Sequence, residues 1–172
     1  KEFGLWARER ETLAEELTRF FTTFESTGDF LLGVLVIALL PAIGEELVFR
    51  GMLQPELFRA TGNHHAAIWI SAIIFSAFHM QFFGFVPRML LGALFGYLYV
   101  WSGNLLMPMF AHFINNGFSV LMMYLYQKGT VTIDIDTPEA APWPVVIGFT
   151  TVFVGLLYYF KKFHQAQNQP LA

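Results

Sequence analysis

Long apolar stretches dominate the chain after residue 29. They cover approximately residues 30–53, 66–83, 87–101, 105–126 and 144–160, and the first is interrupted by Pro41 and Gly44. No Lys, Arg, Asp or Glu occurs in residues 60–87 or 89–127. A membrane-spanning helix needs about 20 mostly apolar residues, so each charge-free window has room for one or two spans. The alternation typical of outer-membrane strands is missing from the pattern. The sequence therefore predicts an all-α, polytopic transmembrane helix bundle with about five spans.

The N-terminal segment has a different pattern, in which apolar residues recur at helical spacing among Glu and Arg over residues 5–25. This predicts an amphipathic helix. Such a helix either lies on the membrane surface or forms a solvated connection between two spans. The expected organisation is a charged amphipathic segment (1–29), a transmembrane domain (30–162) and a polar tail (163–172).

Composition supports a membrane location. Hydrophobic residues make up 55% of the 172 residues and charged residues only 13%, about half of the charged share of a soluble domain. Residues 1–29 hold 11 of the 23 charged side chains, so the rest of the chain is poorer still. Cysteine is absent, which excludes a disulfide-stapled secreted module, and a net charge of −3 gives no basis for nucleic-acid binding. We expect an integral membrane protein in contact with lipid.

Few charges bear on the orientation. Lys161 and Lys162 follow the last apolar stretch, whereas Asp134, Asp136 and Glu139 lie in the loop before it. Cytoplasmic loops are enriched in Lys and Arg. We therefore expect a cytoplasmic C-terminus.

Ionisable residues at membrane depth are costly and mark candidate functional sites. Glu46 and Arg50 are four residues apart, with the acid first, which is the favoured order for a helical ion pair. Glu45 lies about 100° further round the helix and cannot share that face. Either Glu45 is left to act as a general base, or all three residues form one structural charge cluster.

Three further polar residues stand in apolar surroundings. His79 follows Phe75 by one helical turn, and His112 and Asn116 are again four residues apart. Two polar side chains one turn apart can both donate hydrogen bonds to a developing oxyanion. The alternatives are hydrogen-bonded packing for His79 and helix–helix hydrogen bonding for Asn116. By helical geometry, Asn115 is expected to lie off the face of His112 and Asn116.

Together, these residues provide the groups required for water-mediated amide hydrolysis: a base, orienting groups and oxyanion donors. Glu45, His79 and His112 would also be the ligand set if a metal such as zinc were bound, since two His and one Glu are common zinc ligands. The signature of two His flanking Glu on one helix is absent. We therefore assign no metal and expect no cofactor, with a divalent ion as the alternative.

The residues resemble the motifs of the CAAX prenyl endopeptidase and bacteriocin-processing (CPBP or Abi) family of intramembrane proteases. The family pattern is EExxxR, FxxxH and HxxxN on successive membrane helices. This chain carries all three in order, as Glu45-Glu46…Arg50, Phe75…His79 and His112…Asn116.

The resemblance implies that Glu45 activates water, that His79 orients it or moves a proton, and that His112 and Asn116 form the oxyanion hole. Glu46 and Arg50 would hold the helix that presents Glu45. The family was long classed with metalloproteases, and a metal-free, glutamate-dependent mechanism fits this sequence better.

The resemblance and the residues lead to one main prediction of function. We expect an intramembrane endopeptidase of a bacterial inner (plasma) membrane that cleaves a membrane-associated peptide or protein. The alternative is a non-catalytic protein on the same fold, such as a bacteriocin immunity factor or an accessory subunit of a larger membrane complex. A proton or ion pathway is a third reading, but it requires polar residues through the full membrane depth.

Overall fold

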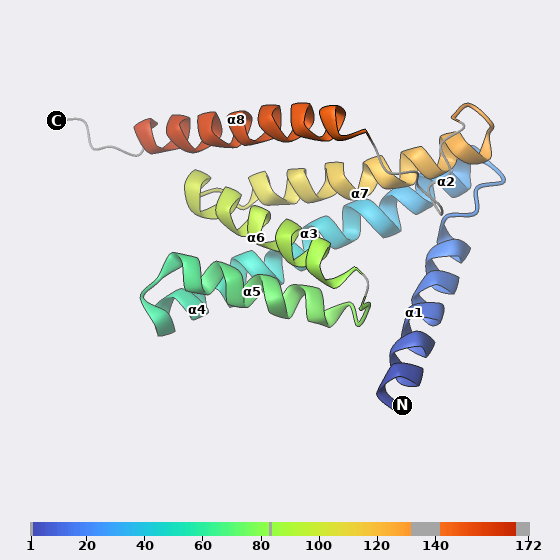
Figure 1. Cartoon of the computed structure of the whole chain (residues 1–172), viewed down its shortest axis with the longest axis horizontal. Helices are drawn as coiled ribbons and strands as arrows, with labels where there is room; N and C mark the ends of the chain where they lie inside the picture. The colour runs from blue at the N-terminus through green and yellow to red at the C-terminus, as the bar shows by residue number, and fades with distance from the viewer. Residues whose placement is uncertain (1, 83, 132–141, 168–172) are drawn as a thin grey trace.

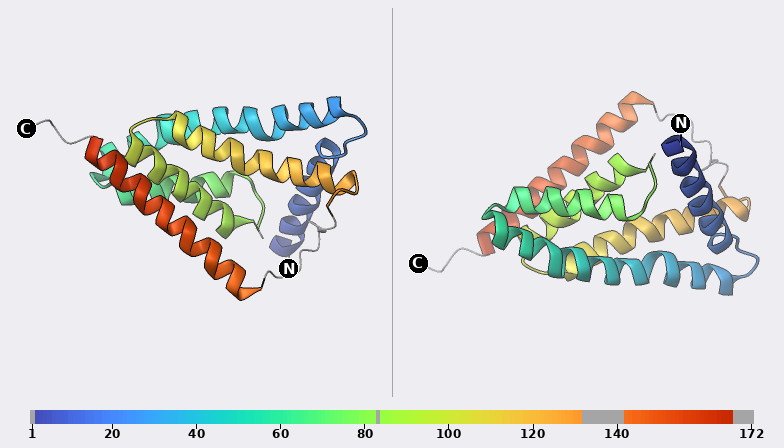
Figure 2. Two further views of the ribbon diagram at one scale, coloured as in Figure 1. Left: turned by 90° about the horizontal axis from the view of Figure 1, so that it is seen from above. Right: turned by 90° about the horizontal axis from the view of Figure 1, so that it is seen from below.

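The chain folds as a series of helices, with no strand among the residues that the computed structural model describes, which are 2–82, 84–131 and 142–167. A separate helix, α1 (Glu2–Phe21), precedes the bundle that the remaining elements form (Figures 1 and 2). The all-α prediction is confirmed for these residues. In chain order, the elements after α1 are α2 (Thr27–Gly33), η1 (Val34–Leu39), α3 (Leu40–Glu46), η2 (Leu47–Leu53), α4 (Gln54–Thr61), α5 (His64–Phe78), α6 (Phe85–Ser102), α7 (Leu106–Gln127) and α8 (Trp143–Gln167).

Five of these elements form one continuous helix from Thr27 to Thr61. It begins at a capping box, in which Ser26 accepts a hydrogen bond from the Asp29 N–H and Asp29 accepts one from the Ser26 N–H. Two π-helical segments, η1 and η2, interrupt its α-helical winding. Each segment ends shortly before a proline, Pro41 or Pro55, which has no N–H and crowds the carbonyl one turn earlier. The sequence identified Pro41 as an interruption but gave no sign of π-helical winding.

The tightest helix packing lies between α5 and α6. Ile68 and Ala72 of α5 and Ala93 of α6 form a buried cluster, and Gly92 approaches α5 closely. A Cβ atom added at Gly92 would lie 3.3 Å from the Ala72 Cα. Small residues at such positions allow membrane helices to come together.

The long helix is fixed to α6 by two side chains one turn apart. The Arg50 Nη2 donates a hydrogen bond to the Gly92 carbonyl at 2.5 Å, and the Gln54 amide donates one to the Gly96 carbonyl at 3.3 Å. The donors are four residues apart on one helix and the acceptors four apart on the other. These two bonds fix the position of α6 along the axis of the long helix, which carries Glu45 and Glu46.

Three helices are long and apolar enough to cross a membrane within the part of the chain described here: Thr27–Thr61, Phe85–Ser102 and residues 143–166 of α8. The expected count of about five spans is therefore not confirmed. The predicted span over residues 66–83 is the 15-residue helix α5, which ends at Phe78 and rises only about 22 Å. The predicted span over residues 105–126 forms α7, but its apolar sequence is broken by His112, Asn115 and Asn116.

The two ends of the chain pack loosely in comparison with this centre. The helix predicted over residues 5–25 is present as α1, with Leu5, Leu17 and Phe20 exposed. α8 contacts α6, and most of its side chains are exposed. The loop acids Asp134, Asp136 and Glu139 lie outside the described residues. The prediction of a cytoplasmic C-terminus and the three-part domain organisation therefore stay predictions.

Candidate active site

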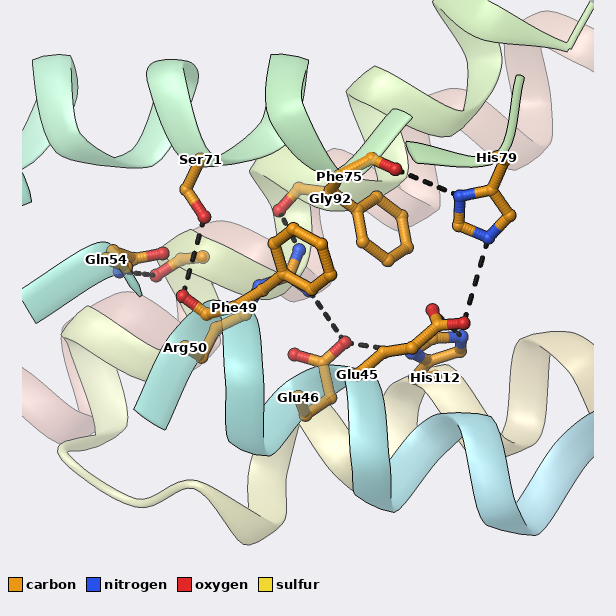
Figure 3. Close-up of polar contacts among 11 residues, drawn as sticks. Glu45, Glu46, Phe49, Arg50, Gln54, Ser71, Phe75, His79, Gly92 and His112 are labelled. Carbon is orange, nitrogen blue, oxygen red and sulfur yellow. Dashed lines mark hydrogen bonds and ion pairs between the residues drawn. The ribbon is translucent and has the colours of Figure 1, made fainter. Parts of the chain in front are cut away.

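Glu46 is the centre of a buried hydrogen-bond network. Its Oε1 atom lies 2.8 Å from the Arg50 Nη1 and 2.8 Å from the His112 Nδ1 (Figure 3). Glu46 is 0% exposed and Arg50 is 1% exposed. The ion pair expected from their four-residue spacing is confirmed, and it also connects the long helix to α7 through His112.

Glu45 has a different environment from its neighbour. Its side chain is 30% exposed and lies between two imidazoles, with Oε1 at 3.8 Å from the His79 Nε2 and Oε2 at 3.9 Å from the His112 Nε2. Figure 3 shows the two rings approaching the carboxylate from α7 and from the end of α5. The Oε2 atom is buried and has no hydrogen-bond partner within the described chain. The separations are too long for direct hydrogen bonds.

The contacts at Nδ1 determine the tautomer of each imidazole, and therefore whether the Nε2 atom that faces Glu45 carries a proton. The Nδ1 of His79 lies 2.9 Å from the Phe75 carbonyl oxygen, which can only accept, so Nδ1 carries the proton. The Nδ1 of His112 faces the arginine-paired Glu46 carboxylate, which likewise only accepts. In the neutral rings, both Nε2 atoms therefore present lone pairs to the space around Glu45.

Aromatic side chains hold the two imidazoles in place. The Phe75 ring makes T-shaped contacts with both imidazoles, and its centroid lies 5.0 Å from that of His79 and 6.1 Å from that of His112. The Phe95 ring stacks on His112 at 5.0 Å. The Arg50 guanidinium lies 5.0 Å from the Phe75 ring centroid, at cation–π distance. Phe75 thus contacts the ion pair on one side and the imidazoles on the other.

Asn116 lies on α7 one turn after His112. Its amide nitrogen donates a hydrogen bond to the Ile37 carbonyl at 3.1 Å, and its Oδ1 accepts one from the Asn115 amide at 3.2 Å. The Ile37 carbonyl is the one that an N–H at position 41 would bond in a regular helix, and Pro41 has no N–H. Each of the two asparagine amides retains one N–H beyond these bonds.

These side chains surround a cavity of about 460 Å³. The predicted residues Glu45, Phe75, His79, His112 and Asn116 all line it, whereas Glu46 and Arg50 are not among the lining residues. The complete lining is Ile37, Pro41, Glu45, Phe75, His79, Gly84, Pro87, Arg88, Leu91, Phe95, His112, Asn115, Asn116 and Ser119.

The lining corrects one expectation and adds residues that the sequence analysis missed. Asn115 is expected to lie off the face of His112 and Asn116, but it borders the same cavity. The cavity is wide enough to reach Asn115, which is more exposed than Asn116. Arg88 was not proposed as a site residue. Its isolation between two charge-free windows of the sequence is the signal that could have identified it.

The geometry of the donors around Glu45 bears on whether the site could hold a metal ion. Glu45, His79 and His112 converge, but each imidazole faces a different carboxylate oxygen. Within the described ranges, no group of three or more His, Cys, Asp or Glu is placed to hold a metal ion. In this arrangement the three side chains do not present a ready ligand sphere.

The match to known proteins covers the same part of the chain. The family model described as type II CAAX prenyl endopeptidase Rce1-like matches residues 27–118. The chain is 35% identical over 85 residues to the uncharacterized protein YpbD of Bacillus subtilis, covering 47% of this chain and 40% of YpbD. It is 34% identical over 98 residues to the membrane-embedded CAAX protease MroQ of Staphylococcus aureus, covering 54% and 39%.

These matches extend over about two fifths of the length of each relative. No solved structure gives a significant match. The family match includes all three motifs from Glu45 to Asn116, and it ends at residue 118, within α7.

Proposed function

The chain belongs to the Rce1-like family of type II CAAX prenyl endopeptidases, and from this premise we propose that it hydrolyses a peptide bond of a membrane-associated peptide or protein. The observation that carries the proposal is the position of Glu45. Its carboxylate is buried on one side, lacks an arginine or lysine ion pair within the described chain, and faces two imidazole nitrogens across a cavity. Apolar helices and the membrane-embedded relative make this an integral membrane protein.

Glu45 is the proposed general base. A water molecule in the cavity gives a proton to the Glu45 carboxylate, and its oxygen attacks the carbonyl carbon of the scissile amide. The carbonyl electrons move to the oxygen and form a tetrahedral oxyanion. When the C–N bond breaks, Glu45 returns the proton to the leaving nitrogen, so the products are a carboxylic acid and an amine.

His79 and His112 are proposed to orient the attacking water. In the neutral rings, both Nε2 atoms can accept hydrogen bonds. They lie 3.8 and 3.9 Å from the Glu45 carboxylate oxygens, too far for direct hydrogen bonds, so a water molecule can bridge an imidazole and the carboxylate. A water that donates to one imidazole and to Glu45 has its lone pairs directed toward the cavity. His79 can also take up a proton during turnover, because its Nδ1–H remains bonded to the Phe75 carbonyl.

Asn116 is the proposed oxyanion donor. One of its amide hydrogens is bonded to the Ile37 carbonyl, which fixes the side chain, and the other is free to donate. Asn115 provides a second amide on the same cavity wall. His112 joins them as a donor only in its protonated form, because its neutral Nε2 has no hydrogen to give.

Glu46 and Arg50 are proposed as positioning residues. The Glu46 carboxylate holds the His112 ring through Nδ1, and Arg50 neutralises that carboxylate and bonds α6.

We place the protein in a bacterial plasma membrane with its C-terminus in the cytoplasm, since Lys161 and Lys162 lie near the end of α8. Its partners would be lipid and the substrate, with no metal or other cofactor required by these steps.

Cleavage can be tested in the native membrane by comparing the wild type with Glu45→Gln. The substitution keeps the size of the side chain and removes its basicity. We expect peptide termini found in the wild type to disappear in Glu45→Gln, as measured by terminal-peptide proteomics. The matched control is Glu56→Gln, in which the same change is made at an exposed carboxylate that pairs with Arg59 on α4.

The same membranes should be used to record co-purifying proteins. If termini are identical in all three strains while wild type and Glu45→Gln retain the same large partner, the endopeptidase proposal is wrong and the protein is an accessory subunit. Loss of folding in Glu45→Gln, measured as a lower unfolding midpoint in detergent, would move Glu45 to the structural network.

A further inference from the structure

Arg88 is the one Lys or Arg among the residues that line the cavity. It lies in the first turn of α6, on the wall that also carries Gly84 and Pro87. Its Nη2 bonds the side-chain oxygen of Gln81 in the loop after His79. Its charge lies within electrostatic range of Glu11 on α1 and of Glu45. The guanidinium is thus held by a side of the cavity that the proposed catalytic carboxylate also lines.

One end of this guanidinium has no partner. The Nη1 atom is buried and makes no hydrogen bond with any described residue. A buried donor on a charged group is costly to leave unbonded. The other arginine at this depth, Arg50, uses Nη1 for Glu46 and Nη2 for a backbone carbonyl. Arg88 therefore differs from Arg50 in having both N–H groups of Nη1 unused, on a side chain that lines the cavity.

The backbone leaves room for this arrangement. A Cβ atom added at Gly84 would lie 2.8 Å from the Arg88 Nη2 and 3.4 Å from its Cζ. Glycine at position 84 lets the guanidinium lie against the main chain, while Gln81 limits its rotation. A planar guanidinium held in this way matches the two oxygens of a carboxylate better than a flexible ammonium does.

We infer that Arg88 binds a carboxylate of the peptide substrate and thereby selects where the chain is cut. The inference rests on the proposed function, because it concerns the same cavity. The carboxylate has two sources, a free C-terminus or an Asp or Glu side chain. In either case, the anion is held close to Glu45, so cleavage occurs within a few residues of it.

The test uses the full chain in detergent micelles and a synthetic peptide library, with cleavage sites read by mass spectrometry. We expect wild-type sites to cluster at a fixed distance from a C-terminus or from an acidic residue. Arg88→Gln should lose this clustering and cleave the preferred peptides at least about tenfold more slowly through a higher KM. Arg88→Lys should restore part of the preference, since it keeps the charge and loses the fork.

Peptides cleaved by the wild type are then compared as free acids and as C-terminal carboxamides. Loss of cleavage in the carboxamide assigns the C-terminal carboxylate. Unchanged cleavage, together with loss on Glu→Gln or Asp→Asn substitution in the peptide, assigns the side chain. The matched enzyme control is Arg59→Gln, at an exposed arginine of α4, which should keep the wild-type profile.

The outcomes separate the two proposals. Glu45-dependent cleavage with an identical profile in wild type and Arg88→Gln overturns the role of Arg88 and leaves the proposed protease activity intact. A fall in kcat at unchanged KM also overturns substrate binding, because it places Arg88 in the chemical step. If the wild type cleaves the library no more than Glu45→Gln does, both proposals are contradicted. Unfolding midpoints of the variants identify any loss that comes from misfolding.

Discussion

Glu45 and Glu46 are neighbours in the sequence and have opposite surroundings. Glu46 is fully buried and bonded to Arg50 and His112, whereas Glu45 is 30% exposed in an open cavity and bonded to neither imidazole. The 100° step between adjacent helical residues is enough to separate them. One carboxylate is used to fix three helices, and its neighbour is left available for chemistry. A single helical turn can therefore hold both the support of a site and its proposed reactive group.

The difference also concerns what happens when a partner is removed. The supporting side is closed, so a lost partner leaves a charge that water cannot reach. The cavity side is open, so water can replace a lost contact. Substitutions on the supporting side should therefore lower the free energy of unfolding more than substitutions on the cavity side.

Arg50→Met should have the largest effect on stability. It removes the ion pair with Glu46 and the bond to the Gly92 carbonyl, leaving a buried carboxylate without a counter-charge. We expect a loss of about 3–5 kcal/mol in the free energy of unfolding, measured by denaturant titration in micelles. Glu45→Gln, in the cavity, should change this free energy by less than about 1 kcal/mol.

A double substitution tests whether the loss comes from the stranded charge. Glu46→Gln combined with Arg50→Met removes both charges and should recover much of the stability lost in Arg50→Met. Equal losses in Arg50→Met and in the double variant would mean that packing, and not charge pairing, stabilises this region.

Gly96→Ala should have an intermediate effect. The added Cβ would lie 2.7 Å from the Gln54 Oε1 and 3.0 Å from the Ile68 Cγ2, where α6 meets the long helix and α5. We expect a loss of about 1–3 kcal/mol from overpacking. Gly148→Ala in α8 is the control, because no atom lies within 4 Å of its added Cβ. A stable Gly96→Ala protein would show that the contact between the helices is looser than described.

Pro41→Ala should have the smallest effect and should act on the cavity side. The new N–H can bond the Ile37 carbonyl and compete with the Asn116 amide. We expect a more stable helix, and a kcat lower by about tenfold as Asn116 loses its fixed position. The measurement is cleavage of a peptide identified in the library, alongside the unfolding midpoint. If Pro41→Ala lowers kcat by the same factor when it is added to Asn116→Ala, the substitution does not act through Asn116.

Local spacing was sufficient for part of this arrangement. The helical class follows from the apolar windows, and the Glu46–Arg50 pair follows from a four-residue separation on one helix. Both are properties of a single segment. The approach of His79 and His112 to Glu45 depends on three helices and could not be derived from spacing, so the expectation came from the resemblance to a protease family.

Other features were missed for physical reasons. The π-helical segments change the phase of the long helix, and hydrophobic periodicity over a few turns is too coarse to show this. The count of about five spans is not confirmed, because α5 ends early, at Phe78, and polar cavity-lining residues interrupt the apolar sequence of α7. Asn115 and Arg88 became site residues only when the width of the cavity was known.

The two hydrogen bonds from Arg50 and Gln54 to α6 have a mechanical consequence. Their donors and acceptors are each four residues apart, so sliding α6 along the long helix by one residue breaks both at once. In an apolar environment, neither donor can recover its loss from water. We therefore expect the two helices to move as one rigid body. Because α7 is also bonded to the long helix, through His112 to Glu46 and through Asn116 to the Ile37 carbonyl, any motion that opens the cavity must come from outside these three helices.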